Sequence, residues 1–159
     1  DAIEDIRNED SVVIMLTPDG VPFKQSIVYD LSKKKHLILL CGHYEGVDER
    51  VLEEIVTDNI SIGDYVLTGG ELPALVVIDS ITRLVPGVIE EESKDNDSFT
   101  DNLLDYPTYT KPREYNNLSV PEILISGDHE KIKEYRYNEQ LRITKERRPD
   151  LLGDIKDES

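Results

Sequence analysis

Two glycine-containing loops, each lying directly after an apolar run, constrain the fold of this chain more than any other feature. The run at residues 36–41 is short, continuous and apolar, which is typical of a strand buried in a parallel sheet. It leads into the loop CGHYEGVDER at residues 41–50. The second loop, SIGDYVLTGGELP at residues 61–73, opens an apolar helix. Because loops that follow parallel strands lie at one edge of the sheet, the sequence predicts a ligand crevice there.

Strands and helices alternate through the first half of the chain. Residues 17–20, TPDG, have the composition of a tight turn, whereas Asp48 is suited to cap a helix and Pro86 to end one. Strands are predicted at residues 11–16, 36–41 and 59–62, and helices at 25–34, 48–56 and 72–85. This order predicts an α/β fold with a parallel sheet that helices cover on both faces.

The chain changes character at residues 88–97, which are polar, acidic and without hydrophobic periodicity, and therefore indicate a linker. Beyond it, the sequence predicts a short helix at residues 99–104 and a long one at 130–147, with an irregular, proline-marked segment between them. We expect an α/β domain at residues 1–87 and a small helical domain at residues 98–159.

The composition limits the classes of protein to which the chain can belong. Hydrophobic residues make up 38% and charged residues 33% of the 159 residues, which describes a folded globular protein rather than a disordered one. No apolar run approaches the length of a membrane span. The single cysteine, Cys41, rules out an internal disulfide and fits a reducing cytosol, so we expect a cytoplasmic protein. No group of histidines and cysteines has the spacing of a metal site.

Charge is unevenly distributed along the chain. The formal net charge is −16, which by itself argues against a nucleic-acid partner. Residues 1–110 contain 8 Lys and Arg against 23 Asp and Glu, whereas residues 111–148 contain 9 against 7. Any polyanion is therefore expected to bind the C-terminal third, although mixed charge of this kind also describes an ordinary solvated helix.

Several polar residues have a structural interpretation that needs no ligand. Glu45 and Asp48 precede a predicted helix, where acids stabilise the positive end of the helix dipole. His129 lies beside the start of the long C-terminal helix and is interpreted as a neighbour of its cap. These residues therefore do not by themselves indicate a site.

The same caution applies to Asp97 and Arg83. Asp97 lies just before the predicted helix at 99–104, and Ser98 and Asp101 have the spacing of a capping box. Arg83 follows Asp79 by four residues, which is the spacing of a surface ion pair on a helix. A capping role and a chemical role are compatible for Asp97.

Longer motifs identify a family. Besides the two loops, they are DSITRLVPG at residues 79–87, DSF at 97–99, YTKP at 109–112 and RRPDLL at 147–152. With these motifs the chain resembles the bacterial tRNA (guanine-N1)-methyltransferase (TrmD) family of the SPOUT class over nearly its whole length. That family begins with further βα units and continues beyond the last motif, so we expect a fragment lacking the N-terminal part. The resemblance also implies a trefoil knot, in which residues 61–70 thread through a loop.

The resemblance implies methyl transfer from S-adenosyl-L-methionine to N1 of the guanosine at position 37 of tRNA, next to the anticodon. It makes Asp97 the general base that removes the N1 proton, and Arg83 the group that stabilises charge on guanine O6. It makes Glu45 and Asp48 contacts to the target guanine, and places His129 near the RNA. The residues implied to bind the cofactor are Leu16, Pro18, Gly42, Tyr44, Ile62, Gly63, Asp64, Tyr65, Val66, Leu67, Gly69, Gly70 and Pro73.

The family resemblance further implies a homodimer with composite active sites. The cofactor loops come from one subunit, and Asp97 and the basic C-terminal part come from the other, with an interface near the helix at 72–85. The chain departs from the family after residue 89, where relatives usually have a glycine and one further residue and this chain has three glutamates, residues 90–92. The linker is thus one residue shorter, while the match at Asp97 is kept.

Two other classes of protein remain open at this point. One is a knotted module that binds S-adenosyl-L-methionine or RNA without turnover. The other is a hydrolase with paired carboxylates, such as Glu45 and Asp97. The presence of Asp97 and Arg83 favours the enzyme over the module, and binding of S-adenosyl-L-methionine would argue against a hydrolase.

Overall fold

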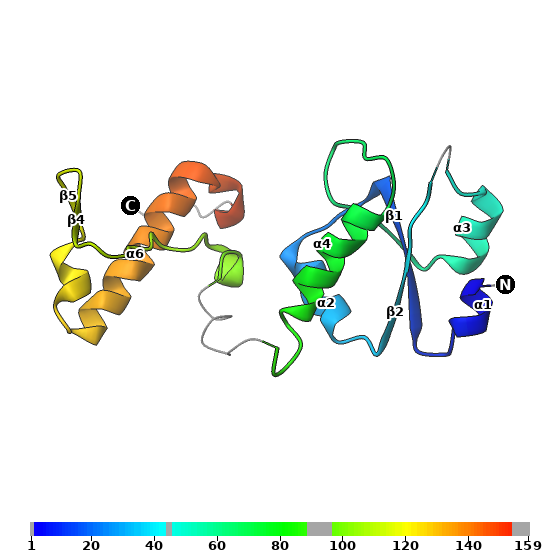
Figure 1. The fold of residues 1–159 in the computed structure, drawn as a ribbon, viewed down its shortest axis with the longest axis horizontal. Helices are drawn as coiled ribbons and strands as arrows, with labels where there is room; N and C mark the ends of the chain where they lie inside the picture. The colour runs from blue at the N-terminus through cyan, green and yellow to red at the C-terminus, as the bar shows by residue number, and fades with distance from the viewer. Residues whose placement is uncertain (1, 44–45, 89–96, 154–159) are drawn as a thin grey trace. The chain divides into compact units, whose positions relative to one another are not determined.

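The computed structural model describes residues 2–43, 46–88 and 97–153 (Figure 1). Backbone contacts divide the chain into two compact units, Asp1–Glu90 and Glu91–Ser159. Each unit has its own elements and its own buried residues. Within the described ranges, none of the helices is both long enough and apolar enough to span a membrane.

Unit 1 is built on a parallel sheet of three strands. The strands are β1 (Ser11–Pro22), β2 (His36–Leu40) and β3 (Asp58–Ser61), and their order in the sheet is β2-β1-β3. Both pairings of the central strand β1 are parallel. The continuous apolar runs predicted a parallel sheet because a strand between covering helices has no solvent-facing side, and the structure confirms it.

The predicted turn at residues 17–20 is wrong. Strand β1 continues through this segment to Pro22, and Ile60 of β3 is the register partner of both Leu16 and Val21. The residues between them form an irregularity in the pairing rather than a chain reversal. Gly20 permits it, because a Cβ at this position would lie 2.5 Å from the backbone nitrogen of Ile60. Pairing with a strand far away in the sequence thus overrides the local turn signal.

The core of unit 1 lies between one face of the sheet and two helices. The alternation of strand residues places Ile14, Leu16 and Ile60 on that face. Helices α2 (Gln25–Ser32) and α4 (Glu71–Thr82) cover it, whereas α1 (Ala2–Ile6) and α3 (Glu49–Ile55) lie on the other side (Figure 1). The helices contribute the buried side chains Val28, Leu31, Ala74, Val77 and Ile81. Complete burial of a valine, leucine or isoleucine side chain stabilises the fold by about 1.5–3 kcal/mol.

Helices α2, α3 and α4 follow the sequence prediction, with shorter C-terminal ends, whereas α1 was not predicted. The carboxylate of Asp48 caps α3, because it accepts a hydrogen bond of 3.0 Å from the Arg50 N–H, so the predicted cap is confirmed. Helix α2 ends two residues before the predicted boundary and α4 ends three residues before it. After α4, the N–H of Val85 donates to the carbonyl of Thr82, an i→i−3 bond that tightens the chain ahead of Pro86.

Unit 2 is organised around the long helix α6 (His129–Arg147), close to the predicted range of 130–147. The proline-marked segment contains a hairpin of β4 (Glu114–Tyr115) and β5 (Leu118–Ser119), which the sequence analysis did not predict. Its two turn residues, Asn116 and Asn117, have φ values of 51° and 62°, as the tightest hairpin turns require. Two 3₁₀ turns, Glu122–Ile125 and Pro149–Leu152, flank α6.

A threonine fixes the N-terminal segment of unit 2 against α6. The Thr144 side chain is fully buried, and its Oγ1 accepts a hydrogen bond of 2.9 Å from the Leu104 N–H. The same hydroxyl donates to the Gln140 carbonyl at 2.6 Å, so both of its hydrogen-bonding functions are used. The residues that precede Leu104 and Thr144 in the sequence, Leu103 and Ile143, are buried apolar side chains.

The helix and capping box predicted for residues 98–104 are wrong. The segment contains only a 3₁₀ turn, Thr100–Asn102, and Phe99, Asp101 and Asn102 have φ values between 52° and 72°. Residues other than glycine rarely adopt such left-handed backbone conformations, and a right-handed helix cannot continue through them. The hydroxyl of Ser98 accepts a hydrogen bond of 3.0 Å from the Asp105 N–H instead of capping a helix. The contact of Leu104 with Thr144 on α6 shows that tertiary packing, rather than local propensity, shapes this segment.

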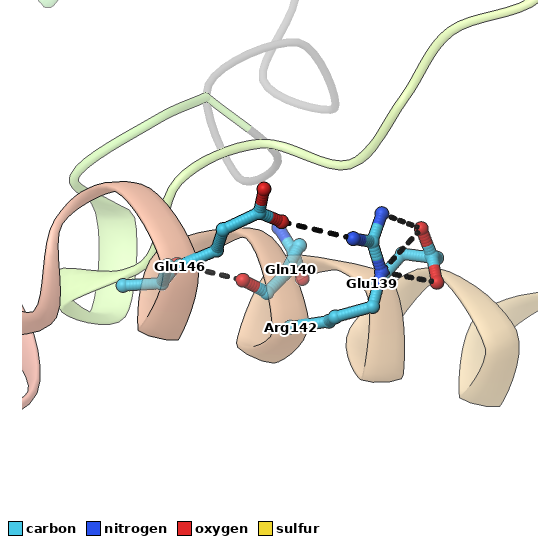
Figure 2. Close-up of polar contacts among 5 residues, drawn as sticks. Glu139, Gln140, Arg142 and Glu146 are labelled. Atoms are coloured by element: carbon cyan, nitrogen blue, oxygen red, sulfur yellow. Dashed lines mark hydrogen bonds and ion pairs between the residues drawn. The ribbon is translucent and has the colours of Figure 1, made fainter.

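The exposed surface of α6 carries an internal ion-pair network. Arg142 lies between Glu139 and Glu146, at N–O distances of 2.8 and 3.1 Å (Figure 2). The hydrogen bonds from Arg142 lower the pKa of Glu139, and the same contact raises the pKa of Arg142. Exposed pairs of this kind contribute little to stability, but they neutralise the arginine locally.

Candidate functional site

A cavity of about 300 Å³ lies beside the two glycine loops of unit 1. Residues 15–18 of β1 bound it, together with the loop after β2 and the long loop between β3 and α4. Among the residues predicted to bind a cofactor, those that line it are Leu16, Pro18, Gly42, Ile62, Gly63, Tyr65, Val66, Leu67, Gly69, Gly70 and Pro73. Asp64 is not among the lining residues, and Tyr44 lies outside the described residues.

Other lining residues were missed by sequence reasoning. They are Met15, Thr17, His43, Gly46, Ile60, Ser61 and Thr68. Most of them are direct sequence neighbours of predicted residues, so their position in the two loops could have indicated that they line the cavity. Thr17 was assigned to a turn, and its contribution depends on the irregular pairing of β1 with β3.

Close backbone contact holds the two loops together. The Gly70 N–H donates a hydrogen bond of 3.2 Å to the carbonyl of Gly42. A Cβ on Gly70 would lie 2.6 Å from the Cα of Cys41, so only glycine fits here without displacing the backbone. This contact places the start of α4 directly against the end of β2.

A hydrogen bond between the side chains of His43 and Glu71 links the same two loops. This hydrogen bond lowers the pKa of Glu71, so this carboxylate is charged at neutral pH. Burial, with a smaller contribution from the charge of Glu71, raises the pKa of Cys41. The thiol is therefore protonated at neutral pH, which disfavours a role as a nucleophile.

The cavity lining is mainly apolar and glycine-rich. Among the described residues that line it there is no aspartate or glutamate. The polar groups at the cavity are those of the backbone and of five side chains, Thr17, His43, Ser61, Tyr65 and Thr68. Such a lining suits an aromatic ring held by main-chain groups and apolar walls, in a volume at the lower end of the range for small-molecule sites. The lining residues that the structure describes do not supply the paired carboxylates of a hydrolase.

The predicted catalytic and RNA-contacting residues are distributed over both units. Arg83 is exposed and follows the last residue of α4, and its N–H donates to the Asp79 carbonyl at 3.1 Å. Asp97 is half-buried and lies in unit 2, ahead of the 3₁₀ turn. His129 is exposed and is the first residue of α6, whose cap is Asp128, so its predicted place beside a cap is confirmed.

The acidic pair predicted to contact guanine is only partly described. Besides capping α3, Asp48 forms an ion pair of 2.7 Å with the Arg50 guanidinium. Hydrogen bonds from Arg50 lower the pKa of Asp48, which is therefore ionised. Glu45 lies outside the described residues. In the described ranges, no group of His, Cys, Asp and Glu forms a candidate metal site.

Parallel strands that lead into two loops in close contact, beside a mainly apolar cavity, define an α/β protein with a cavity of small-molecule size at one edge of its sheet. Comparison with known families is more specific. The family described as "tRNA (Guanine-1)-methyltransferase TrmD" matches residues 1–154, and the chain belongs to this family.

Curated relatives agree with this assignment. The chain is 63% identical over 140 residues to a tRNA (guanine-N(1)-)-methyltransferase of Clostridioides difficile, covering 87% of this chain and 61% of the relative. It is 56% identical over 153 residues to a protein of the same name from Staphylococcus epidermidis, covering 95% and 62%, respectively. A third relative, from Staphylococcus carnosus, is 51% identical over 154 residues, covering 96% and 63%. The chain thus spans about 61–63% of the length of these relatives.

Proposed function

We propose that the protein transfers a methyl group from S-adenosyl-L-methionine to N1 of the guanosine at position 37 of tRNA, next to the anticodon. Membership of the family and the names of the relatives support the reaction. The structural observation that carries the proposal is the cavity of unit 1, because the residues implied to bind the cofactor gather around it from three separate segments. A tRNA substrate places this activity in the cytoplasm.

The lining of the cavity fits the proposed cofactor. Backbone groups and apolar side chains can hold a neutral adenine ring, and glycines allow close approach to it. The lining residues already named, together with Tyr44 and Asp64 as proposed neighbours, would hold S-adenosyl-L-methionine. When bound, it would supply a methyl group on a positively charged sulfur, and as the carbon–sulfur bond breaks the sulfur would leave as a neutral thioether.

In the proposed mechanism, the protein activates guanine rather than the methyl donor. Neutral N1 of guanine is a poor nucleophile because its lone pair is delocalised and it carries a proton. The carboxylate of Asp97 accepts that proton as N1 forms its bond to the methyl carbon. Arg83 stabilises the negative charge that develops on O6. Glu45 and Asp48 accept hydrogen bonds from the N–H groups of the base. To do so, Asp48 releases its ion pair with Arg50 and binds the base instead.

The two units divide this work between them. We assign cofactor binding to residues 1–87, and RNA binding, with His129 near the RNA, to residues 98–159, with 88–97 as the connection. Within the first part, residues 61–70 thread through a loop to form a trefoil knot. The close contact of Gly70 with Cys41 supports this arrangement, because it presses the end of that segment against the loop after β2.

Helix α4 supports a homodimer. One side of the helix packs on the sheet through Ala74, Val77 and Ile81. Leu72, Leu75 and Ile78 lie outside this core with exposed fractions of 60%, 60% and 49%, as does Val76. A helix that is apolar all round is typically buried on all sides, so we propose that a second copy covers the exposed residues. The active site then combines the cavity of one subunit with Asp97 of its partner.

Replacing Leu75 with glutamate should convert the dimer into monomers, because a charge in the centre of an apolar interface must be desolvated without a partner. Sedimentation velocity measures the change in mass. The matched control is Leu118→Glu, the same substitution at the hairpin of unit 2, where the leucine is 75% exposed. If the Leu75→Glu protein remained dimeric, α4 would not form the dimer interface.

A methylation assay tests the proposed function as a whole. The protein is incubated with S-adenosyl-L-methionine labelled on the methyl group and with unmodified tRNA, and the modified nucleoside is identified by mass spectrometry. We expect 1-methylguanosine at position 37 and none in a tRNA whose position 37 is adenosine. Cofactor binding by calorimetry without any methyl transfer would instead support a non-catalytic binding module.

A further inference from the structure

A second cavity, of about 380 Å³, lies within unit 2 and has no role in the reaction described above. The irregular segment before the hairpin forms one part of its wall, and residues of the 3₁₀ turn Glu122–Ile125 and of α6 form another. The side chains that give it its chemical character are Tyr106, Tyr109, Lys111, Arg113, Ile125 and Arg136.

The cavity concentrates positive charge in an acidic protein. Its lining contains three cations, Lys111, Arg113 and Arg136, and among the described lining residues no carboxylate. In the described part of the chain, these three cations make no ion pair. Two other arginines of unit 2 are neutralised instead, because Arg142 binds two glutamates and Arg148 binds Asp150. A group of three cations without a carboxylate among the described lining residues contrasts with the formal net charge of −16 of the whole chain.

The cavity also presents planar surfaces. The guanidinium carbon of Arg136 lies 4.7 Å from the centre of the Tyr106 ring, a cation–π contact that orients both groups. Tyr109, a residue that is 46% exposed, adds a second aromatic ring. Aromatic rings and guanidinium planes are the surfaces on which unpaired RNA bases stack, and neighbouring lysines and arginines bind the adjoining phosphates.

We propose that this cavity binds one unpaired nucleotide of the RNA substrate, other than the guanosine that is methylated. Its base stacks against Tyr106, Tyr109 and Arg136, and its phosphates contact Lys111 and Arg113. The inference rests on the proposed function only in that tRNA supplies the nucleotide. The proposed nucleotide site would be a specific contact between unit 2 and RNA, in addition to general attraction between basic residues and phosphates.

The test measures binding of a fluorescent anticodon stem-loop RNA by anisotropy at several salt concentrations. Tyr106→Leu should weaken binding by about 5- to 100-fold, the range for loss of one base–aromatic stack, whereas Tyr106→Phe keeps the ring and should bind as the wild type. Lys111→Gln and Arg113→Gln should each weaken binding and reduce the slope of log K against log salt by roughly 0.7–0.9. Arg142→Gln is the matched control on α6, and it should change neither quantity.

A blunt RNA duplex of equal length separates stacking from simple attraction of phosphates. We expect it to compete poorly, because paired bases cannot enter the cavity. Equal competition by the duplex, or wild-type binding by Tyr106→Leu with an unchanged melting curve, would overturn the proposal. An equal loss of affinity in Arg142→Gln would do the same.

Cofactor affinity measured on the same variants separates this inference from the proposed function. S-adenosyl-L-methionine should bind each of them as it binds the wild type, because its cavity belongs to unit 1. If the wild type bound the stem-loop through these residues but never methylated it, the reaction would be wrong and the nucleotide site would stand. If the Tyr106→Leu protein bound RNA and methylated it as the wild type does, the proposed reaction would stand and the nucleotide site would be wrong.

Discussion

Replacing Gly70 with valine is expected to weaken binding of S-adenosyl-L-methionine by roughly 10- to 100-fold or more. The Cβ would lie 2.6 Å from the Cα and 2.9 Å from the Cβ of Cys41, and the backbone there cannot move aside as the end of a flexible side chain can. Gly70 has a φ of −82°, which valine tolerates, so the effect comes from lack of space. Overpacking of this kind costs about 1–3 kcal/mol.

The damage should reach the cofactor because Gly70 joins the two loops that form the cavity. Pushing it away from Cys41 breaks its hydrogen bond to Gly42 and separates two parts of the lining. Isothermal calorimetry measures the affinity, and a thermal melt shows whether the variant is folded.

Gly69→Ala provides the comparison for this prediction. Its Cβ would meet only the ends of the Glu71 and His43 side chains, at 2.5 and 2.9 Å, and both can rotate away. We expect a clearly smaller loss of affinity than for Gly70→Val. Wild-type affinity in a folded Gly70→Val protein would show that the cofactor does not depend on this junction.

Replacing Asp97 with asparagine is expected to lower the rate of methyl transfer by about 10²- to 10⁴-fold, the usual contribution of a positioned general base. The amide has nearly the size of the carboxylate but cannot accept the N1 proton at neutral pH. The alternative interpretation, in which Asp97 precedes a capped helix, has less support, because this described segment contains neither the predicted helix nor its capping box.

Single-turnover methylation of unmodified tRNA, with enzyme in excess, isolates this chemical step from product release. Asp97→Asn should bind S-adenosyl-L-methionine as the wild type does, because Asp97 is not part of the cavity lining. Asp105→Asn, at another half-buried aspartate of unit 2, is the control and should retain the rate. A near-normal rate in Asp97→Asn would exclude this residue as the base.

The amino-acid sequence alone determined the regular part of unit 1. Short apolar runs form strands, and their alternation with amphipathic segments leaves a parallel sheet as the arrangement that buries them. The cap at Asp48 and the range of α6 also follow from local patterns, since caps and helical periodicity depend on neighbours within a few residues. The residues placed around the cavity came from the resemblance to a family, which carries information that periodicity does not contain.

Tertiary contacts decided the points at which local patterns failed. The TPDG segment became part of a strand because Leu16 and Val21 both meet Ile60, a residue about 40 positions away. Residues 99–102 left the helical conformation in a segment whose next residues pack against Thr144 of α6. In each case, non-local backbone hydrogen bonds or a buried polar contact outweigh propensities that differ by less than about 1 kcal/mol per residue.

The sites likewise depend on distances that no sequence pattern encodes. Gly70 must be glycine because the backbone of Cys41 occupies the space of its side chain, although 28 residues separate them. Arg136 stacks on Tyr106 because α6 returns to the irregular segment that precedes the hairpin. The sequence specifies which chemical groups are available, and packing of distant segments decides which of them meet, because side-chain contact is a property of the folded chain.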